Sequence, residues 1–213
     1  MAEGLESVRP GINAPFEDSE TSVESYLSWF EVAERELFVH HQTIVDLLEP
    51  AEGKTVADVG AGTGLFMPAL SKAVGPSGAV HCLETATKFI PQLQARKASL
   101  GEGGANVQVT HCGHTSLPFQ DASLDALLMV DTYHHIEFPS LILPECRRVL
   151  KPDGVCLVVD LERIEGVSSE WVMGHVRADK AAVIQEWAAQ GFSHREIHSL
   201  PLKENWVIFF FKP

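Results

Sequence analysis

A glycine-rich segment, residues 56–66, lies between an apolar run and a helical pattern, and its glycines are Gly60, Gly62 and Gly64. Glycine has no Cβ, so the turn can be tight and a ligand can lie against the backbone. The helix that follows offers free N–H groups and a partial positive charge to a ligand. Glu84, twenty residues after Gly64 and at the end of the next apolar run, suits a bidentate hold on two ribose hydroxyls. The segment therefore predicts a nucleotide-cofactor site.

The glycine spacing separates two classes of nucleotide cofactor. A dinucleotide-binding loop has the spacing G-x-G-x-x-G, whereas this loop has G-x-G-x-G. Asp58 lies just before the loop, where its carboxylate would repel a pyrophosphate and attract an ammonium or a sulfonium. Both features favour a cationic cofactor. A nicotinamide-dependent oxidoreductase remains as an alternative.

A second polar cluster follows the apolar run 124–130 and contains Asp131, Tyr133, His134 and His135. His134 and His135 are candidate bases, because an imidazole titrates near physiological pH. In the alternative interpretation, one of them packs against or caps the loop and the other is solvated. Tyr133 is a candidate hydrogen-bond donor to a substrate or cofactor, or else a packing residue.

The apolar pattern places both clusters on an α/β framework. Short buried runs alternate with helical spacing, which is typical of a doubly wound, mostly parallel sheet with ligands at the carboxyl ends of its strands. We expect seven strands at 55–59, 79–83, 107–111, 124–130, 155–160, 192–198 and 205–211. The last two form a hairpin with Pro201 in its loop. Helices are expected at 65–74, 87–100, 141–150 and 181–190, a loop at 101–106 and a turn at 151–154.

Residues 1–50 are expected to form an arm and a helical lid ahead of a cofactor-binding domain, residues 51–213. The first twenty residues are rich in Pro, Gly and acid without periodicity, which predicts an extended arm. Apolar residues at spacings of three and four then predict two helices between Thr21 and Leu48, with Pro50 and Gly53 ending the second.

These motifs together resemble the class I S-adenosylmethionine-dependent methyltransferases, especially the small-molecule branch (methyltransferase type 11) that includes quinone-biosynthesis enzymes. The resemblance spans residues 54–160. It is carried by segment 58–64, Glu84, the turn 117–119 with Asp125, and segment 148–154. It implies a Rossmann-like fold. Within that fold, the methionine end of the cofactor would be held by Gly60, Ala61, Gly62 and Gly64, and the ribose by Glu84.

The adenine contact departs from the family pattern. The loop after the third strand normally supplies an acid to the adenine amino group, but here the loop is His111–Thr115 and Gly113 stands near that position. We expect His114 or a backbone carbonyl to substitute. Asp131 is expected to orient the cofactor.

The resemblance also implies the reaction. A methyl group would pass from S-adenosylmethionine, with S-adenosylhomocysteine as product, to a small polar acceptor with an O, N or S nucleophile. His134 and His135 would act as base or as acceptor-orienting groups, and similar enzymes often carry a histidine near position 135. Tyr133 and Asp160 complete the candidate catalytic set. A methyltransferase-fold partner protein without catalysis remains as an alternative.

Catechol-type methyltransferases suggest a divalent-cation alternative, because they use strand-end carboxylates in this region. Asp131 and Asp160 end neighbouring strands, and the residues within loop reach are Glu162, His134, His135 and His175. The competing interpretation pairs Asp160 or Glu162 with Arg163 or Arg177. No metal ligand is assigned, because these groups are scattered and have no tight spacing motif.

Composition limits the class of partner. The 213 residues are 45% hydrophobic and 21% charged with a net charge of −13, and residues 1–50 hold eleven acids against only Arg9 and Arg35. This balance disfavours nucleic acid and anionic membranes and favours a neutral or cationic acceptor. The four cysteines form no CxxC pair and no apolar run approaches the roughly 18 residues of a membrane span, so we expect a cytoplasmic enzyme. The oligomeric state is not indicated.

Overall fold

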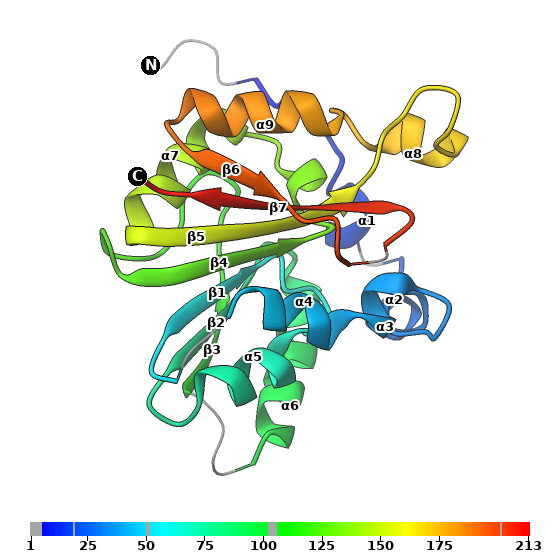
Figure 1. Cartoon of the computed structure of the whole chain (residues 1–213). Helices are drawn as coiled ribbons and strands as arrows, with labels where there is room; N and C mark the ends of the chain where they lie inside the picture. Colours follow the sequence, from blue (N-terminus) through cyan, green and yellow to red (C-terminus); the bar gives the residue numbers. More distant parts are fainter. Residues whose placement is uncertain (1–5, 19, 50–51, 102–105, 201) are drawn as a thin grey trace.

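The computed structural model describes residues 6–18, 20–49, 52–101, 106–200 and 202–213. A seven-stranded sheet of order β3-β2-β1-β4-β5-β7-β6 forms its centre (Figure 1). The strands are β1 (Thr55–Val59), β2 (Ala79–Glu84), β3 (Asn106–His111), β4 (Leu124–Val130), β5 (Leu150–Leu161), β6 (Ser193–Glu196) and β7 (Asn205–Phe211). Strands β1 to β5 pair in parallel, and β7 runs antiparallel to β5 and β6. The predicted sheet class is confirmed.

Helices cover both faces of the sheet, with α4, α5 and α6 on one side and α7 and α9 on the other (Figure 1). The bounds are α4 (His41–Leu47), α5 (Met67–Val74), η1 (Thr87–Phe89), α6 (Ile90–Ser99), α7 (Pro139–Val149) and α9 (Lys180–Ala189). Strand side chains alternate between two cores. Val207 and Phe209 join the α4–α6 side, whereas Ile208 and Phe210 join the α7–α9 side. In the described ranges no helix is long and apolar enough to cross a membrane.

The N-terminal segment is more ordered than its composition predicts. It contains α1 (Ala14–Glu17), α2 (Val23–Phe30) and α3 (Glu36–Val39) ahead of α4. The expected extended arm is therefore wrong at α1, where Pro15 occupies the first turn and loses no helical hydrogen bond. The two expected helices are three, because α2 ends at Phe30. Its C-cap residue, Glu31, is held by Arg96 on α6, which donates to both oxygens of the Glu31 carboxylate.

Two other expectations are corrected. Residues 151–154 do not leave the sheet but bulge within β5, since Leu150 pairs with Leu124 and the register then shifts before Val155 pairs with Ala126. Helix α8 (Glu170–His175) is not expected from periodicity, although Ser169 caps it by accepting a hydrogen bond from the Val172 N–H. The expected helix stop at Pro50, the loop residues 102–105 and Pro201 lie outside the described residues.

Candidate active site

The carboxyl ends of β1, β2, β4 and β5 open into a cavity of about 1160 Å³. The strand order reverses between β1 and β4, and ligands of α/β sheets bind at such switch points. Helices α1, α2, α3 and α8 supply further walls. Most of the predicted site residues line this cavity, namely Asp58, Gly60, Ala61, Gly62, Glu84, Gly113, His114, Asp131, His134 and His135. Gly64, Tyr133 and Asp160 do not.

The glycine loop is pinned to the end of β2. The N–H groups of Gly60 and Ala61 both donate to the Leu83 carbonyl at 2.9 Å. Gly60 has φ +74°, and a Cβ there would stand 2.6 Å from the side chain of Thr132. Gly64 has φ +83°, and a Cβ on it would stand 2.9 Å from Leu93 on α6, so this glycine lets the loop pack on the helix behind it. The loop thus exposes backbone to the cavity at Gly60–Gly62 and not at Gly64.

Glu84 is buried at the cavity wall with a fixed carboxylate. Its Oε2 accepts from the Gly62 N–H at 2.7 Å and its Oε1 from the Ala86 N–H at 2.9 Å. Burial raises the pKa of Glu84, against these backbone donors, which lower it. Each oxygen retains a further acceptor site, so the carboxylate can receive two neighbouring hydroxyls. This geometry fits the predicted contact with a ribose.

Asp58 carries an unsatisfied oxygen. The side chain is 2% exposed, and its Oδ2 has no hydrogen-bond partner in the described part of the chain. Burial, and then the nearby charge of Glu84, raise the pKa of Asp58 to about 7. An orphaned buried carboxylate beside a cavity is stabilised by a cationic ligand group, which fits a cofactor that carries an ammonium.

The loop after β3, residues 111–115, has no acidic side chain where the family pattern has one. Gly113 and His114 line the cavity, and His114 Nε2 lies 3.1 Å from Glu17 Oε1 on α1. His114 therefore reaches the cavity edge while it holds the arm. Whether it or Gly113 contacts adenine stays a prediction.

The strand-β4 rim turns sharply into η2 (Tyr133–His135), after Asp131 at φ +47°. His134 is buried, and its Nδ1 lies 2.5 Å from Asp160 Oδ1, while its backbone N–H donates to Asp160 Oδ2 at 2.9 Å. Burial alone would lower the pKa of His134, but the Asp160 carboxylate outweighs it and the pKa is raised. Asp160 thus fixes the position of His134.

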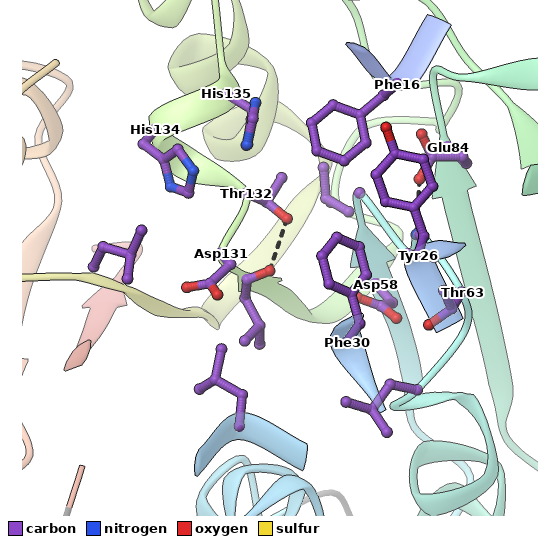
Figure 2. A pocket seen from close by; sticks show the side chains of 18 of the residues that line it. Phe16, Tyr26, Phe30, Asp58, Thr63, Glu84, Asp131, Thr132, His134 and His135 are labelled. Carbon is purple, nitrogen blue, oxygen red and sulfur yellow. Dashed lines mark hydrogen bonds between the residues drawn. The ribbon is translucent and has the colours of Figure 1, made fainter. Parts of the chain in front are cut away.

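Two further imidazoles surround His134. Ring centroids are 4.2 Å apart for His134 and His135, 5.0 Å for His134 and His175, and 5.1 Å for His135 and His175. Burial, with the charges of the other two histidines, lowers the pKa of His135 to about 2. Burial and the charge of His134 also lower the pKa of His175 to about 4. Figure 2 shows His134 and His135 on one side of the cavity, with Glu84 and Asp58 on the other.

Asp131 is occupied by protein partners. Arg35 Nη2 donates to Asp131 Oδ2 at 2.7 Å, and Asn205 Nδ2 donates to Oδ1 at 2.6 Å. Sequence reasoning missed Arg35 as a site residue. The available signal was that Arg35 is one of two basic residues among the first fifty. The other, Arg9, donates to the Gly174 carbonyl next to His175.

The remaining predicted residues lie behind the cavity wall. Tyr133 is buried and donates its hydroxyl to Glu186 Oε2 at 2.5 Å, which favours the packing alternative, while a contact with acceptor or cofactor stays a prediction. Asp160 pairs with His134 and not with an arginine, while Arg177 pairs with Glu186. Because Asp131 is also engaged, both strand-end carboxylates considered for a cation are held by protein partners.

The arm and α2 close over the cavity through aromatic and cationic contacts. Phe16 stacks on Tyr26 at 5.1 Å and meets the His135 ring edge-on at 5.0 Å (Figure 2). Lys88 donates to the carbonyls of Pro15, Asp18 and Thr21. Asn13 Nδ2 donates to the His135 carbonyl at 3.0 Å. The arm therefore fastens both to the η2 rim and to η1.

Comparisons with known proteins agree with this geometry. Residues 57–158 match the methyltransferase domain family, a range that contains the glycine loop, Glu84 and η2. The ubiquinone/menaquinone biosynthesis C-methyltransferase of Bordetella avium is 31% identical over 112 residues, or 53% of this chain and 43% of that protein. The demethylmenaquinone methyltransferase of Staphylococcus aureus is 35% identical over 108 residues, or 50% of this chain and 43% of that protein.

The fold is also that of a solved structure. A SAM dependent methyltransferase from Aquifex aeolicus superposes with a TM-score of 0.74 at 24% identity, covering 89% of this chain and 98% of that chain. The chain spans less than half the length of the curated relatives it matches.

Proposed function

We propose that the chain is a class I S-adenosylmethionine-dependent methyltransferase and that it transfers a methyl group from S-adenosylmethionine to a small polar acceptor with an O, N or S nucleophile. One observation carries the proposal. A single cavity has a ribose-type carboxylate, Glu84, on one side and the Asp160-held imidazole of His134 on the other. A cofactor and an acceptor can therefore meet inside it.

The cofactor side fits the residues present. The orphaned Asp58 oxygen would receive the ammonium, the exposed backbone of Gly60–Gly62 would lie along the methionine end, and Glu84 would hold the ribose. Gly64 supports the loop from behind. Bound S-adenosylmethionine would supply an electrophilic methyl group on a sulfonium. The chain then has to align an acceptor with it and exclude water.

The acceptor side is the η2 rim. Asp160 accepts a hydrogen bond from the Nδ1–H of His134, which leaves the His134 Nε2 able to accept a proton or a hydrogen bond. His135 lies beside it against Phe16, which closes this end of the cavity. We assign to His134 and His135 the deprotonation or orientation of the acceptor, and to Asp160 the positioning of His134.

The arm and lid, residues 1–50, are proposed to close the domain 51–213 over its ligands. The Arg35–Asp131 and Lys88 contacts join the two parts across the cavity. Acidic side chains on the cavity wall include Glu34, Glu36, Glu137 and Glu204. The charge of Arg35 is paired with Asp131. The acidic wall favours a neutral or cationic acceptor and disfavours an anionic one or nucleic acid.

The test is a metabolite screen that detects release of S-adenosylhomocysteine. With a located acceptor, His134→Ala should lower turnover about 10²–10⁴-fold while S-adenosylhomocysteine still binds. His194→Ala, at an exposed position of β6, is the matched control and should keep both the turnover and the S-adenosylhomocysteine binding of the wild type. Asp160→Asn should lower kcat and leave the KM for S-adenosylmethionine unchanged.

Three results would contradict the proposal. Equal turnover by His134→Ala, His135→Ala and the wild type would remove the roles of both histidines. Binding of NAD without binding of S-adenosylmethionine would instead support the oxidoreductase, which shares the strand–glycine loop–helix arrangement. If the chain binds S-adenosylhomocysteine but forms none from S-adenosylmethionine with any class of acceptor, the non-catalytic partner protein would be supported.

A further inference from the structure

Three histidines meet at the acceptor end of the cavity, and their arrangement differs from that of a lone base. One ring nitrogen from each of His134, His135 and His175 lies within 4.8 Å of the other two. All three side chains line the cavity. His134 and His135 come from η2 and His175 from the end of α8, so the fold brings together residues some forty positions apart. Three convergent imidazoles are a recognised ligand set for a transition metal with an open position.

The cluster is held in place from behind. Asp160 accepts a hydrogen bond from the Nδ1–H of His134 and so leaves its Nε2 free, which is how a carboxylate commonly orients a metal-binding histidine from behind. His135 has a solvent-inaccessible Nδ1 with no hydrogen-bond partner in the described ranges. An unpaired polar atom in this environment is costly, and a ligand or ion would satisfy it.

The third imidazole is positioned by α8. The His175 ring stacks on Trp171 at 4.6 Å with an interplanar angle of 17°. Arg9, from the arm, donates to the carbonyl of Gly174 immediately before it. His175 is only half-buried, so its side chain has room to adjust. Metal–nitrogen bonds of about 2.0–2.1 Å in a tetrahedral site place the nitrogens about 3.4 Å apart, which requires a small closing movement from the present limit of 4.8 Å.

We propose that His134, His135 and His175 bind one divalent transition-metal ion, with an open coordination position toward the cavity. The all-imidazole set selects zinc, cobalt, nickel, copper or iron over magnesium and calcium, which prefer oxygen ligands. The site differs from the carboxylate pair considered from the sequence, because Asp131 is paired with Arg35 and Asp160 supports His134 from behind.

Metal binding itself does not depend on the proposed reaction. The role of the metal in activating an acceptor rests on the proposed function. An ion at this position would bind an acceptor hydroxyl, thiol or amine through the open position and lower its pKa. His134 and His135 would then orient the acceptor through the ion. A chelating acceptor, with two neighbouring polar atoms, would suit such a site better than a simple alcohol.

The test titrates cobalt(II) into chelator-treated protein and follows the visible absorption of the ion, with zinc as competitor. We expect one equivalent of cobalt to bind, zinc to displace it and magnesium to have no effect. His175→Ala is the decisive variant, because its half-exposed side chain can be removed with little cost to folding, and it should abolish the tight site. Asp160→Asn should weaken binding about 10–100-fold.

Controls separate this proposal from the proposed function. His194→Ala should bind cobalt like the wild type, and Glu84→Gln should keep cobalt while it loses affinity for S-adenosylhomocysteine. Absence of cobalt binding in the wild type, or unchanged binding in His175→Ala, would overturn the metal site. Either result would leave the methyltransferase proposal intact if S-adenosylhomocysteine still binds.

Discussion

The replacement Asp58→Asn should make the protein more stable and a poorer cofactor binder at the same time. Asp58 is buried with an unpaired oxygen, and its pKa is raised from 3.8 to about 7. The folded protein therefore holds this proton more tightly than the unfolded chain does. The stability that Asp58 contributes is fully present below pH 4 and is lost as the pH rises through about 7.

The size of the effect follows from the change in pKa. At 1.36 kcal/mol for each pH unit, a rise from 3.8 to about 7 corresponds to roughly 4 kcal/mol by pH 8. Asparagine keeps the shape of the side chain without the charge. The free energy of unfolding of the variant should therefore exceed that of the wild type by about 2–4 kcal/mol at pH 8. The difference should shrink as the pH falls toward 4. Loss of a charged partner for the cofactor's ammonium should weaken binding about 10–100-fold.

The assay combines urea unfolding at pH 5 and pH 8 with equilibrium binding of S-adenosylhomocysteine at pH 8. Opposite changes in stability and affinity are the expected outcome. If Asp58→Asn is less stable than the wild type at pH 8, the carboxylate is satisfied in the folded protein and the argument from its burial fails. If affinity is unchanged, Asp58 does not receive the cofactor's ammonium.

Three further replacements test separate parts of the site. Glu84→Gln should weaken S-adenosylhomocysteine binding about 10–100-fold by equilibrium dialysis, since a fixed charged acceptor becomes neutral; unchanged affinity would remove Glu84 from the ribose. Gly60→Ala should cost about 1–3 kcal/mol in urea unfolding, because φ is +74° and the added Cβ meets Thr132 at 2.6 Å; a neutral effect would show that the loop relaxes freely. Tyr133→Phe removes the hydrogen bond to Glu186 and should lower the free energy of unfolding by about 1–2 kcal/mol while kcat stays unchanged; a fall in kcat would show that Tyr133 contributes to the reaction.

The sequence predicts the sheet and the placement of the glycine loop beside Glu84 well, because both depend on local patterns. Strands β1, β4 and β7 have the expected bounds, since each is a short buried run between turn residues. Gly60, Gly62 and Glu84 line the cavity because a strand–loop–helix unit and the next strand end fix their positions locally. The bulge at 151–154 was not predictable from Pro152, Asp153 and Gly154, since pairing of Leu150 with Leu124 overrides their turn preference.

The acceptor side depends on contacts between distant segments. The strand-β4 rim could be predicted, but the partner of Asp160 could not, because His134 reaches it only once β4 and β5 are paired. His175 was expected within loop reach of the other two histidines, but periodicity did not indicate α8, the helix that positions it. Arg35 meets Asp131 across 96 residues of sequence, and only its rarity in an acidic segment gave a signal.

The most direct test of the central claim is calorimetric titration of S-adenosylhomocysteine and of NAD into the same preparation of the protein. We predict saturable binding of S-adenosylhomocysteine with one site per chain, competition by S-adenosylmethionine, and no binding of NAD. Binding of NAD together with failure to bind S-adenosylhomocysteine would contradict the assignment of the cavity and of Asp58 and Glu84 within it.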